Sequence, residues 1–259
     1  MFVVEPVACL RDNYAYWLTC TETGATAIVD PSEAAPVIAS AEATGRAPTF
    51  ILCTHHHLDH VGGIPKLAAR YPGVKVIASR YDMGRIEGQT DAVGDGDHFA
   101  VGRVGIDVVF VPGHTLGAVA FVARADGRSA VFTGDTMFLA GCGRLFEGSP
   151  ADMHNSLQRI VMLPDDSQVY CGHEYTADNL RFAASLEPSN EAISRAVSRT
   201  AQLRACGLPT VPHVIAEERA INPFVRTHSA ELRKSLGLGA AASDVEVLAA
   251  AREAKNNFR

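Results

Sequence analysis

Histidine and aspartate side chains crowd one short segment of this sequence. His55, His56, His57, Asp59 and His60 lie within six consecutive positions. Imidazole and carboxylate groups are ligands that first-row divalent metals accept, with water completing the coordination. So many of them on one turn would repel one another or stay without partners unless a cation lay between them. The segment therefore predicts a metal site. In an extended chain His56 would point away from its two neighbours, so we interpret it as a structural residue.

Three further candidate ligands lie far along the chain, each following a short apolar run that ends in glycine. The full set of predicted metal ligands is His55, His57, Asp59, His60, His114, Asp135 and His173. A four-coordinate ion takes at most four ligands, so seven donors predict two ions that share a bridging carboxylate. Because the set contains no cysteine, it is more typical of a catalytic site than of a structural zinc site.

Short apolar segments that end in Gly, Pro or Asp must position these ligands. They predict strands over residues 2–8, 15–20, 26–30, 50–54, 74–78, 106–111, 119–123, 130–133 and 168–171. Helical patterns cover residues 32–43, 65–71, 151–160, 175–185, 189–206, 229–236 and 243–256. No strand is predicted after Gly172. Four of the predicted strands lead into a candidate ligand, and binding residues of α/β proteins gather in loops beyond strand ends. We therefore expect the four loops to form one site.

The change in character near residue 173 predicts two domains, a mixed α/β domain over 1–173 and a small helical domain over 174–259. The formal net charge of −6 argues against a nucleic-acid partner. We find no leader-like segment and no apolar run long enough to span a membrane, so we expect a cytoplasmic protein without a membrane partner. We also expect a monomer. The six cysteines are scattered, and we interpret most of them as small buried apolar residues.

The histidine cluster and the later ligand segments resemble one known superfamily. Residues 54–60 read T-H-H-H-L-D-H, which is similar to the H-x-H-x-D-H signature of the metallo-β-lactamase superfamily. The segments G-H-T at 113–115, G-D-T at 134–136 and C-G-H at 171–173 follow in the order and rough spacing of that superfamily. The resemblance implies an α/β fold of the αββα four-layer type. It also implies that the ligands divide into His55, His57 and His114 for one ion and Asp59, His60 and His173 for the other, with Asp135 as the bridge.

A closer resemblance covers nearly the whole chain. G-C-G-R-L-F-E-G at 141–148, Y-C-G-H-E-Y-T at 170–176, N-P-F at 222–224 and R-x-x-K at 252–255 are similar to glyoxalase II, the hydroxyacylglutathione hydrolases. The helical segment would then be a substrate-binding domain and the first segment the catalytic domain. The resemblance implies that the glutathione part of a substrate is bound by Arg144, Phe146, Tyr175, Arg252 and Lys255.

Two of these positions depart from the family pattern. The family often has lysine where Arg144 stands and tyrosine where Phe146 stands. Arginine can still bind a carboxylate or a carbonyl group. Phenylalanine cannot donate a hydrogen bond, so we expect weaker substrate binding and an unchanged reaction.

The reaction that the resemblance implies is hydrolysis of glutathione thioesters, with S-D-lactoylglutathione as the best substrate and D-lactate as the product. A metal-bridging hydroxide would attack the carbonyl carbon, and Asp59 would be the catalytic residue that orients this nucleophile or accepts its proton. Two divalent ions are expected, zinc in preference to iron or manganese. The alternatives are a mononuclear iron oxygenase acting on glutathione persulfide, a β-lactam or lactone hydrolase, and a metal-binding module without catalysis.

Overall fold

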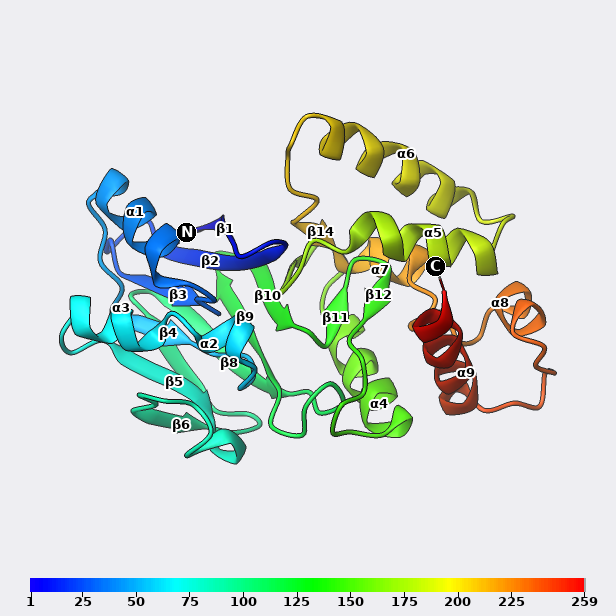
Figure 1. The fold of residues 1–259 in the computed structure, drawn as a ribbon, viewed down its shortest axis with the longest axis horizontal. Coiled ribbons are helices and arrows are strands. Elements are labelled where there is room, and N and C mark those ends of the chain that lie inside the picture. The colour runs from blue at the N-terminus through cyan, green and yellow to red at the C-terminus, as the bar shows by residue number, and fades with distance from the viewer. Residues whose placement is uncertain (259) are drawn as a thin grey trace.

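The computed structural model describes residues 1–258, in which two six-stranded sheets form the centre of the molecule (Figure 1). The first sheet has the strand order β1 (Phe2–Cys9), β2 (Asn13–Cys20), β3 (Thr26–Val29), β4 (Phe50–Leu52), β5 (Lys75–Ser79) and β6 (Asp91–Val93). The second has the order β14 (His213–Val214), β13 (Gln168–Cys171), β10 (Arg128–Gly134), β9 (Val119–Ala125), β8 (Val104–Phe110) and β7 (His98–Val101). Both sheets contain parallel and antiparallel pairs.

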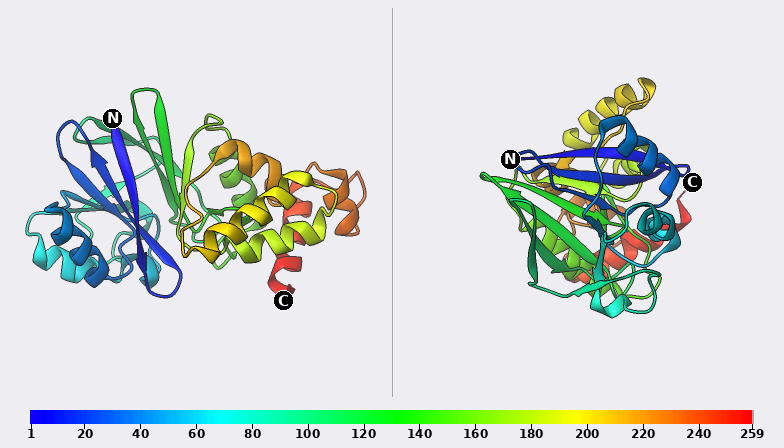
Figure 2. Two further views of the ribbon diagram at one scale, coloured as in Figure 1. Left: turned by 90° about the horizontal axis from the view of Figure 1, so that it is seen from above. Right: turned by 90° about the vertical axis from the view of Figure 1, so that its left-hand side faces the viewer.

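Alternation along the strands explains how the sheets stack. On β2, Tyr16 and Leu18 point into a core shared with strands of the second sheet. Their neighbours Ala15 and Trp17 point to the opposite face, into a separate core under α1 (Ala34–Thr44) and α3 (Ile64–Arg70). Successive side chains of a strand face opposite sides of its sheet, so a strand buried on both faces reads as a continuous apolar run. Figure 2 shows the two sheets inclined to each other with these helices outside the first one.

The second sheet is covered in the same way. On β9, Phe121 belongs to the core between the sheets, while Ala120 and Val122 face a third core. That core is completed by the helices α4 (Pro150–Val161), α7 (Ile215–Ile221) and α9 (Asp244–Asn257). The layers are thus helix, sheet, sheet and helix, which confirms the αββα arrangement expected from the resemblance.

The remaining elements are short or lie towards the C-terminus. They are α2 (Leu58–Val61), the 3-10 turn Arg80–Asp82, the hairpin β11 (Met137–Phe138) and β12 (Gly141–Cys142), α5 (Thr176–Leu186), α6 (Glu191–Ala205) and α8 (Ala230–Ser235). A capping box begins α9, where Ser243 and Glu246 each bond the other's backbone N–H group. Within the described residues, no helix is both long and apolar enough to cross a membrane.

The prediction that no strand follows Gly172 is wrong. The two residues of β14 pair antiparallel with Gln168 and Val169 and so extend the second sheet from the C-terminal part of the chain. A strand this short carries no period-2 pattern, and only its partner makes it a strand. β6, β7 and the β11–β12 hairpin were not predicted either, whereas the nine predicted strands are all present within a few residues of their expected bounds.

Candidate metal centre and substrate pocket

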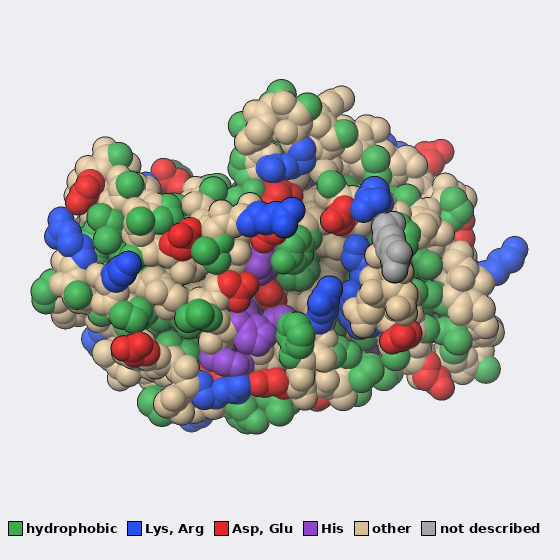
Figure 3. Space-filling view, in the orientation of Figure 1, with side chains coloured by type: hydrophobic (Ala, Val, Ile, Leu, Met, Phe, Trp, Pro, Cys, Tyr) green, Lys and Arg blue, Asp and Glu red, His purple; other side chains and the backbone are tan. Residues whose placement is uncertain are grey.

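Loops at one edge of the two sheets bring the predicted metal ligands together. Residues 55–60 follow β4 and enter α2, while His114, Asp135 and His173 follow β8, β10 and β13. Three groups of three side chains have ligand-type atoms that all lie within 4.8 Å of one another; one is Asp30, His55 and His60, and the other two consist of predicted ligands alone. Those two groups are His55, His57 and His114, and Asp59, His60 and His173. Figure 3 shows histidines gathered with acidic side chains in a hollow at the middle of this face. Their roles as ligands remain a prediction.

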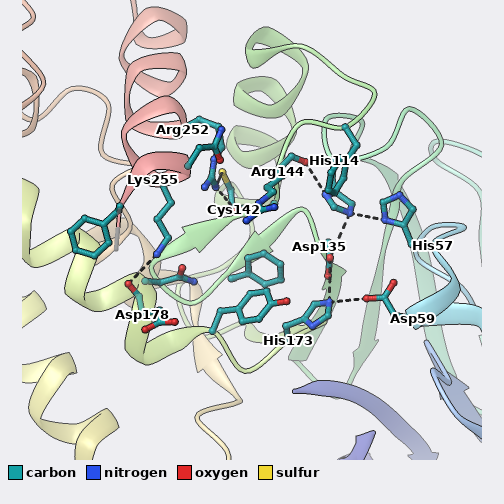
Figure 4. Close-up of a pocket in the computed structure, with 17 residues that line it drawn as sticks. His57, Asp59, His114, Asp135, Cys142, Arg144, His173, Asp178, Arg252 and Lys255 are labelled. Carbon is teal, nitrogen blue, oxygen red and sulfur yellow. Dashed lines mark hydrogen bonds and ion pairs between the residues drawn. The ribbon is translucent and has the colours of Figure 1, made fainter. Parts of the chain in front are cut away.

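Asp135 lies between the two groups, as Figure 4 shows. Its Oδ2 is 3.5 Å from Nε2 of His114 and 3.4 Å from Nε2 of His173. Its Oδ1 is 3.3 Å from Nε2 of His60. Burial opposes the charge of this carboxylate, but the neighbouring His60 and His173 hold its pKa well below the usual range. The carboxylate therefore stays ionised at the position that a bridging ligand would need.

Several donor atoms that face the centre lack a protein partner. Among residues 1–258, Nε2 of His55, Nε2 of His60 and Oδ1 of Asp135 are buried and make no hydrogen bond of acceptable geometry. Nδ1 of His57 and Nε2 of His114 lie 3.0 Å apart. Because buried polar atoms in native proteins are nearly always paired, a cluster of unpaired ones needs a partner that is not protein. Imidazole and carboxylate donors in two adjoining sets fit a pair of divalent cations.

Asp30, an aspartate outside the predicted set, contacts the second group of ligands (Asp59, His60 and His173) at the ring nitrogen of His60 that faces away from the centre. Asp30 follows β3, and its Oδ2 lies 3.0 Å from Nδ1 of His60. Thr54 donates to the same carboxylate from its backbone N at 2.8 Å and from its Oγ1 at 2.6 Å. Asp30 adopts a left-handed backbone conformation with φ of 47°, which aspartate tolerates better than most residues. A bond at Nδ1 fixes the imidazole so that Nε2 faces the centre.

Two other histidines are fixed in a similar way. Asp12, in the turn between β1 and β2, places Oδ1 2.9 Å from Nδ1 of His173. Nδ1 of His114 lies 2.8 Å from the carbonyl oxygen of Arg144 and donates to it. Sequence analysis missed Asp12 and Asp30 because neither belongs to a histidine motif. The available signal for Asp30 was its position at the end of β3, which pairs parallel with the strand that delivers the cluster.

Two glycines let the backbone approach the centre. A Cβ atom at Gly172 would lie less than 3 Å from the carboxylate of Asp135 and the ring of His60. A Cβ atom at Gly143 would come equally close to the carbonyl oxygen of Asp135 and to Nδ1 of His114. The glycines of the G-H and G-C-G motifs are therefore required by lack of space.

A pocket of about 720 Å³ extends from the centre towards α9. All five predicted substrate-binding residues line it, and these are Arg144, Phe146, Tyr175, Arg252 and Lys255. Figure 4 shows the basic side chains approaching from the side of α9 and the β11–β12 hairpin, opposite His57 and Asp59. The pocket thus joins a cation-binding end to an end lined with positive charge. The substrate contacts themselves remain a prediction.

Aromatic rings cover the histidines where the pocket meets the centre. Tyr175 stacks on His173 with ring centroids 4.7 Å apart and an interplanar angle of 5°. Phe146 makes edge contacts with His57 and His114, at centroid distances of 5.6 and 5.3 Å. The Phe146 side chain is 62 % exposed and offers no hydrogen-bond donor at the pocket rim. Burial raises the pKa of Tyr175 well above its usual value, so its hydroxyl stays protonated and can donate.

The two basic residues of α9 differ in how they are held. Arg252 is only 7 % exposed, and its Nη1 donates to the carbonyl oxygen of Cys142 at 2.8 Å. This bond fastens α9 to the β11–β12 hairpin, whereas Nε of Arg252 is buried without a hydrogen-bond partner. Nζ of Lys255 donates to the carbonyl oxygen of Asp178 at 3.0 Å. Burial lowers the pKa of Lys255 to about 8, because a desolvated ammonium group loses its proton more readily.

Comparison with known proteins gives a family match for nearly the whole chain. Residues 10–173 match the family model of the metallo-beta-lactamase superfamily, and residues 174–258 match that of the hydroxyacylglutathione hydrolase C-terminus. A hydroxyacylglutathione hydrolase from Rhodospirillum rubrum is 44% identical over 255 residues, which is 98% of each chain. Another, from Methylococcus capsulatus, is 45% identical over 259 residues and all of both chains.

Solved structures with lower identity show the same fold. The crystal structure of ETHE1 from Myxococcus xanthus superposes with a TM-score of 0.66 at 22% identity, covering 100% of both chains. The crystal structure of TTHA1623 in a di-iron-bound form gives a TM-score of 0.62 at 23% identity, covering 86% of this chain and 99% of the other. At such identities the likeness concerns the fold alone.

Proposed function

The chain belongs to the hydroxyacylglutathione hydrolases of the metallo-β-lactamase superfamily, and we propose that it hydrolyses S-(2-hydroxyacyl)glutathione thioesters. S-D-lactoylglutathione is the proposed best substrate, with glutathione and D-lactate as products. One observation carries the proposal. The pocket joins a cluster of unpaired histidine and aspartate donors to basic side chains contributed by the C-terminal helix. This arrangement suits a substrate with a reactive carbonyl at one end and carboxylates at the other.

The proposed cofactors are two zinc ions, with iron or manganese as alternatives for the same donors. His55, His57 and His114 would hold one ion, Asp59, His60 and His173 the other, and Asp135 would bridge them. When bound, such ions lower the pKa of a bound water and polarise a carbonyl oxygen. The unpaired Nε2 atoms of His55 and His60 support this assignment.

The chain's own groups supply the remaining tasks of the reaction. Oδ2 of Asp59 lies 3.5 Å from Nε2 of His173 and 3.4 Å from Nδ2 of Asn13, so its carboxylate is aimed into the centre. The hydrogen bond with His173 holds the pKa of Asp59 well below its usual range, so the group is ionised at neutral pH. At Oδ2 it can orient the attacking water and take up its proton.

Substrate binding and departure of the leaving group follow from charge. Glutathione thioesters carry two carboxylates and one ammonium group, so Arg144 and Lys255 would attract them, and the Tyr175 hydroxyl would donate a hydrogen bond. The leaving thiolate has a conjugate acid with a pKa of about 8.5. It therefore departs without a strong general acid.

The test combines activity and metal content on one preparation. Purified protein is loaded with zinc, its metal content is measured by mass spectrometry, and hydrolysis of S-D-lactoylglutathione is followed. About two ions per chain and turnover are expected. Full loading without hydrolysis would contradict the function, and one ion per chain would contradict the binuclear centre. Oxygen consumption with glutathione persulfide would instead favour the iron oxygenase. The division at residues 173 and 174, the monomeric state and the cytoplasmic location stay predictions.

A further inference from the structure

One histidine of the cluster belongs to a different set of contacts. The ring of His56 lies 4.9 Å from the ring of His57, but its polar contacts are made outside the two ligand groups. Its Nε2 lies 2.7 Å from Nη2 of Arg85, and its Nδ1 lies 3.4 Å from Oδ1 of Asp82. Asp82 is fully buried, so the ring of His56 is held between a buried carboxylate and a guanidinium group.

Arg85 joins this histidine to the loop that lines the substrate pocket. Its Nη2 donates to Oε1 of Glu147 at 2.5 Å, and its Nη1 contacts Oε2 of the same carboxylate at 3.4 Å. Nη1 also lies 3.3 Å from Oδ1 of Asp82. We name the set His56, Asp82, Arg85 and Glu147 the Arg85 junction. A single exposed ion pair contributes little to stability, but a forked guanidinium with several partners fixes geometry.

Glu147 links Arg85 to a second loop, the one that carries His114. Its Oε2 accepts a hydrogen bond from the backbone N of Leu116 at 2.8 Å. Alongside it, the backbone N of Phe146 donates to the carbonyl oxygen of His114 at 3.2 Å. The segment 144–148 therefore lies against the segment that carries His114, and the Arg85 junction fastens both to the histidine cluster.

One ligand of the first group, His57, is supported differently from the histidines of the second group. In the second group, carboxylates of Asp30 and Asp12 bond the rings of His60 and His173 directly. In the first group, the only hydrogen bond of the His57 ring within residues 1–258 is the one to His114 across the centre. The position of His57 therefore depends on its backbone, whose carbonyl oxygen accepts from the backbone N of His60 and whose neighbour His56 contacts Arg85.

We propose that Arg85 is a positioning residue that keeps the first group of ligands and the substrate-binding segment 144–148 in place together. The inference builds on the proposed function, because it assigns the segment to substrate and the first group to one ion. Loss of the guanidinium would loosen His57 and His114 while leaving Asp30 and Asp12 to hold the second group. One ion would then be released more easily than the other, and substrate affinity would fall with it.

The test compares Arg85→Met with Arg85→Lys and with a matched control. Arg80 lies on the same connection after β5 and pairs with Asp97 at 2.7 Å, on the surface, so Arg80→Met removes a similar ion pair outside the junction. Zinc-loaded proteins are dialysed against increasing chelator, and the ions retained per chain are counted. Arg85→Met should lose one ion at about tenfold lower chelator concentration, the effect typical of removing an outer partner of a metal site. Its second ion and the Arg80→Met protein should behave like wild type.

Two further readouts separate positioning from general destabilisation. KM for the thioester should rise more than kcat falls, and lysine should restore little because an ammonium group cannot bond two partners as a fork. Glu147→Gln should act in the same direction, and the double variant should be no worse than Arg85→Met alone. Equal loss of both ions together with lower thermal stability of the metal-free protein would overturn the proposal, as would wild-type ion retention. Ion retention requires no catalysis, so a failure of thioester hydrolysis would leave this test intact.

Discussion

The metal end and the substrate end of the pocket are built on different supports. At the metal end, His55, His60, His114, Asp135 and His173 are buried beyond the ends of central strands, and His60 and His173 are each fixed by a carboxylate at Nδ1. At the substrate end, the exposed Phe146 and the half-buried Tyr175 and Lys255 lie on a loop, a helix start and the last helix. The side chains of the metal end, whose chemistry would fail after a small displacement, are positioned by the sheets. The side chains proposed to bind the substrate lie on peripheral segments.

The largest effect should come from removing the proton acceptor at the metal end. Asp59→Asn keeps the shape of the side chain but loses the carboxylate, and kcat should fall by about 10²- to 10⁴-fold, the usual contribution of a general base. The measurement is kcat for S-D-lactoylglutathione on zinc-loaded protein with the metal content checked. Near-normal turnover with two ions bound would remove Asp59 from the mechanism.

Two variants compare how strongly Asp30 and Asp12 support the ligands at the metal end. Asp30 bonds His60 and both donor groups of Thr54 in a buried position, whereas the partly exposed side chain of Asp12 contacts only the ring of His173. Asp30→Asn should weaken zinc retention by about 10- to 100-fold, and Asp12→Asn should have a smaller effect. Chelator titration gives both values, and an equal or reversed order would contradict the dependence on burial.

At the substrate end, the dependence of KM on pH should report the charge of Lys255. Because burial lowers the pKa of Lys255 to about 8, its ammonium group is charged below that pH and loses its charge above it. Attraction of an anionic substrate is thus present at pH 7 and lost at pH 9, and KM should rise about fivefold, the equivalent of one partly exposed ion pair. Lys255→Arg stays charged and should flatten this rise, which separates Lys255 from titration of the substrate amino group.

The smallest effect should be a gain. Phe146→Tyr supplies a hydroxyl at the exposed rim, and one extra hydrogen bond to the glutathione part should lower KM by about threefold with kcat unchanged. Steady-state kinetics at pH 7 measure this. An unchanged KM would show that position 146 contributes only its contact with the rings of His57 and His114.

The features that the sequence predicted are those carried by local pattern. The apolar runs located the long strands, and the spacing of the histidines located the ligand loops. Asp12 could not be identified in this way because its partner His173 lies 161 residues along the chain. The bond between Arg252 and Cys142 spans 110 residues, and β14 exists only through its pairing with β13. Each depends on which segments the fold brings together, and no local periodicity records that.

The order of these segments along the chain has a consequence for synthesis on the ribosome. Every predicted metal donor lies before residue 174, whereas Arg252 and Lys255 belong to α9, the last helix. Until α9 docks and Arg252 bonds the Cys142 carbonyl, the pocket lacks the wall that would face a substrate carboxylate. A product interrupted within α9 before Arg252 would therefore contain every predicted metal donor but lack that wall.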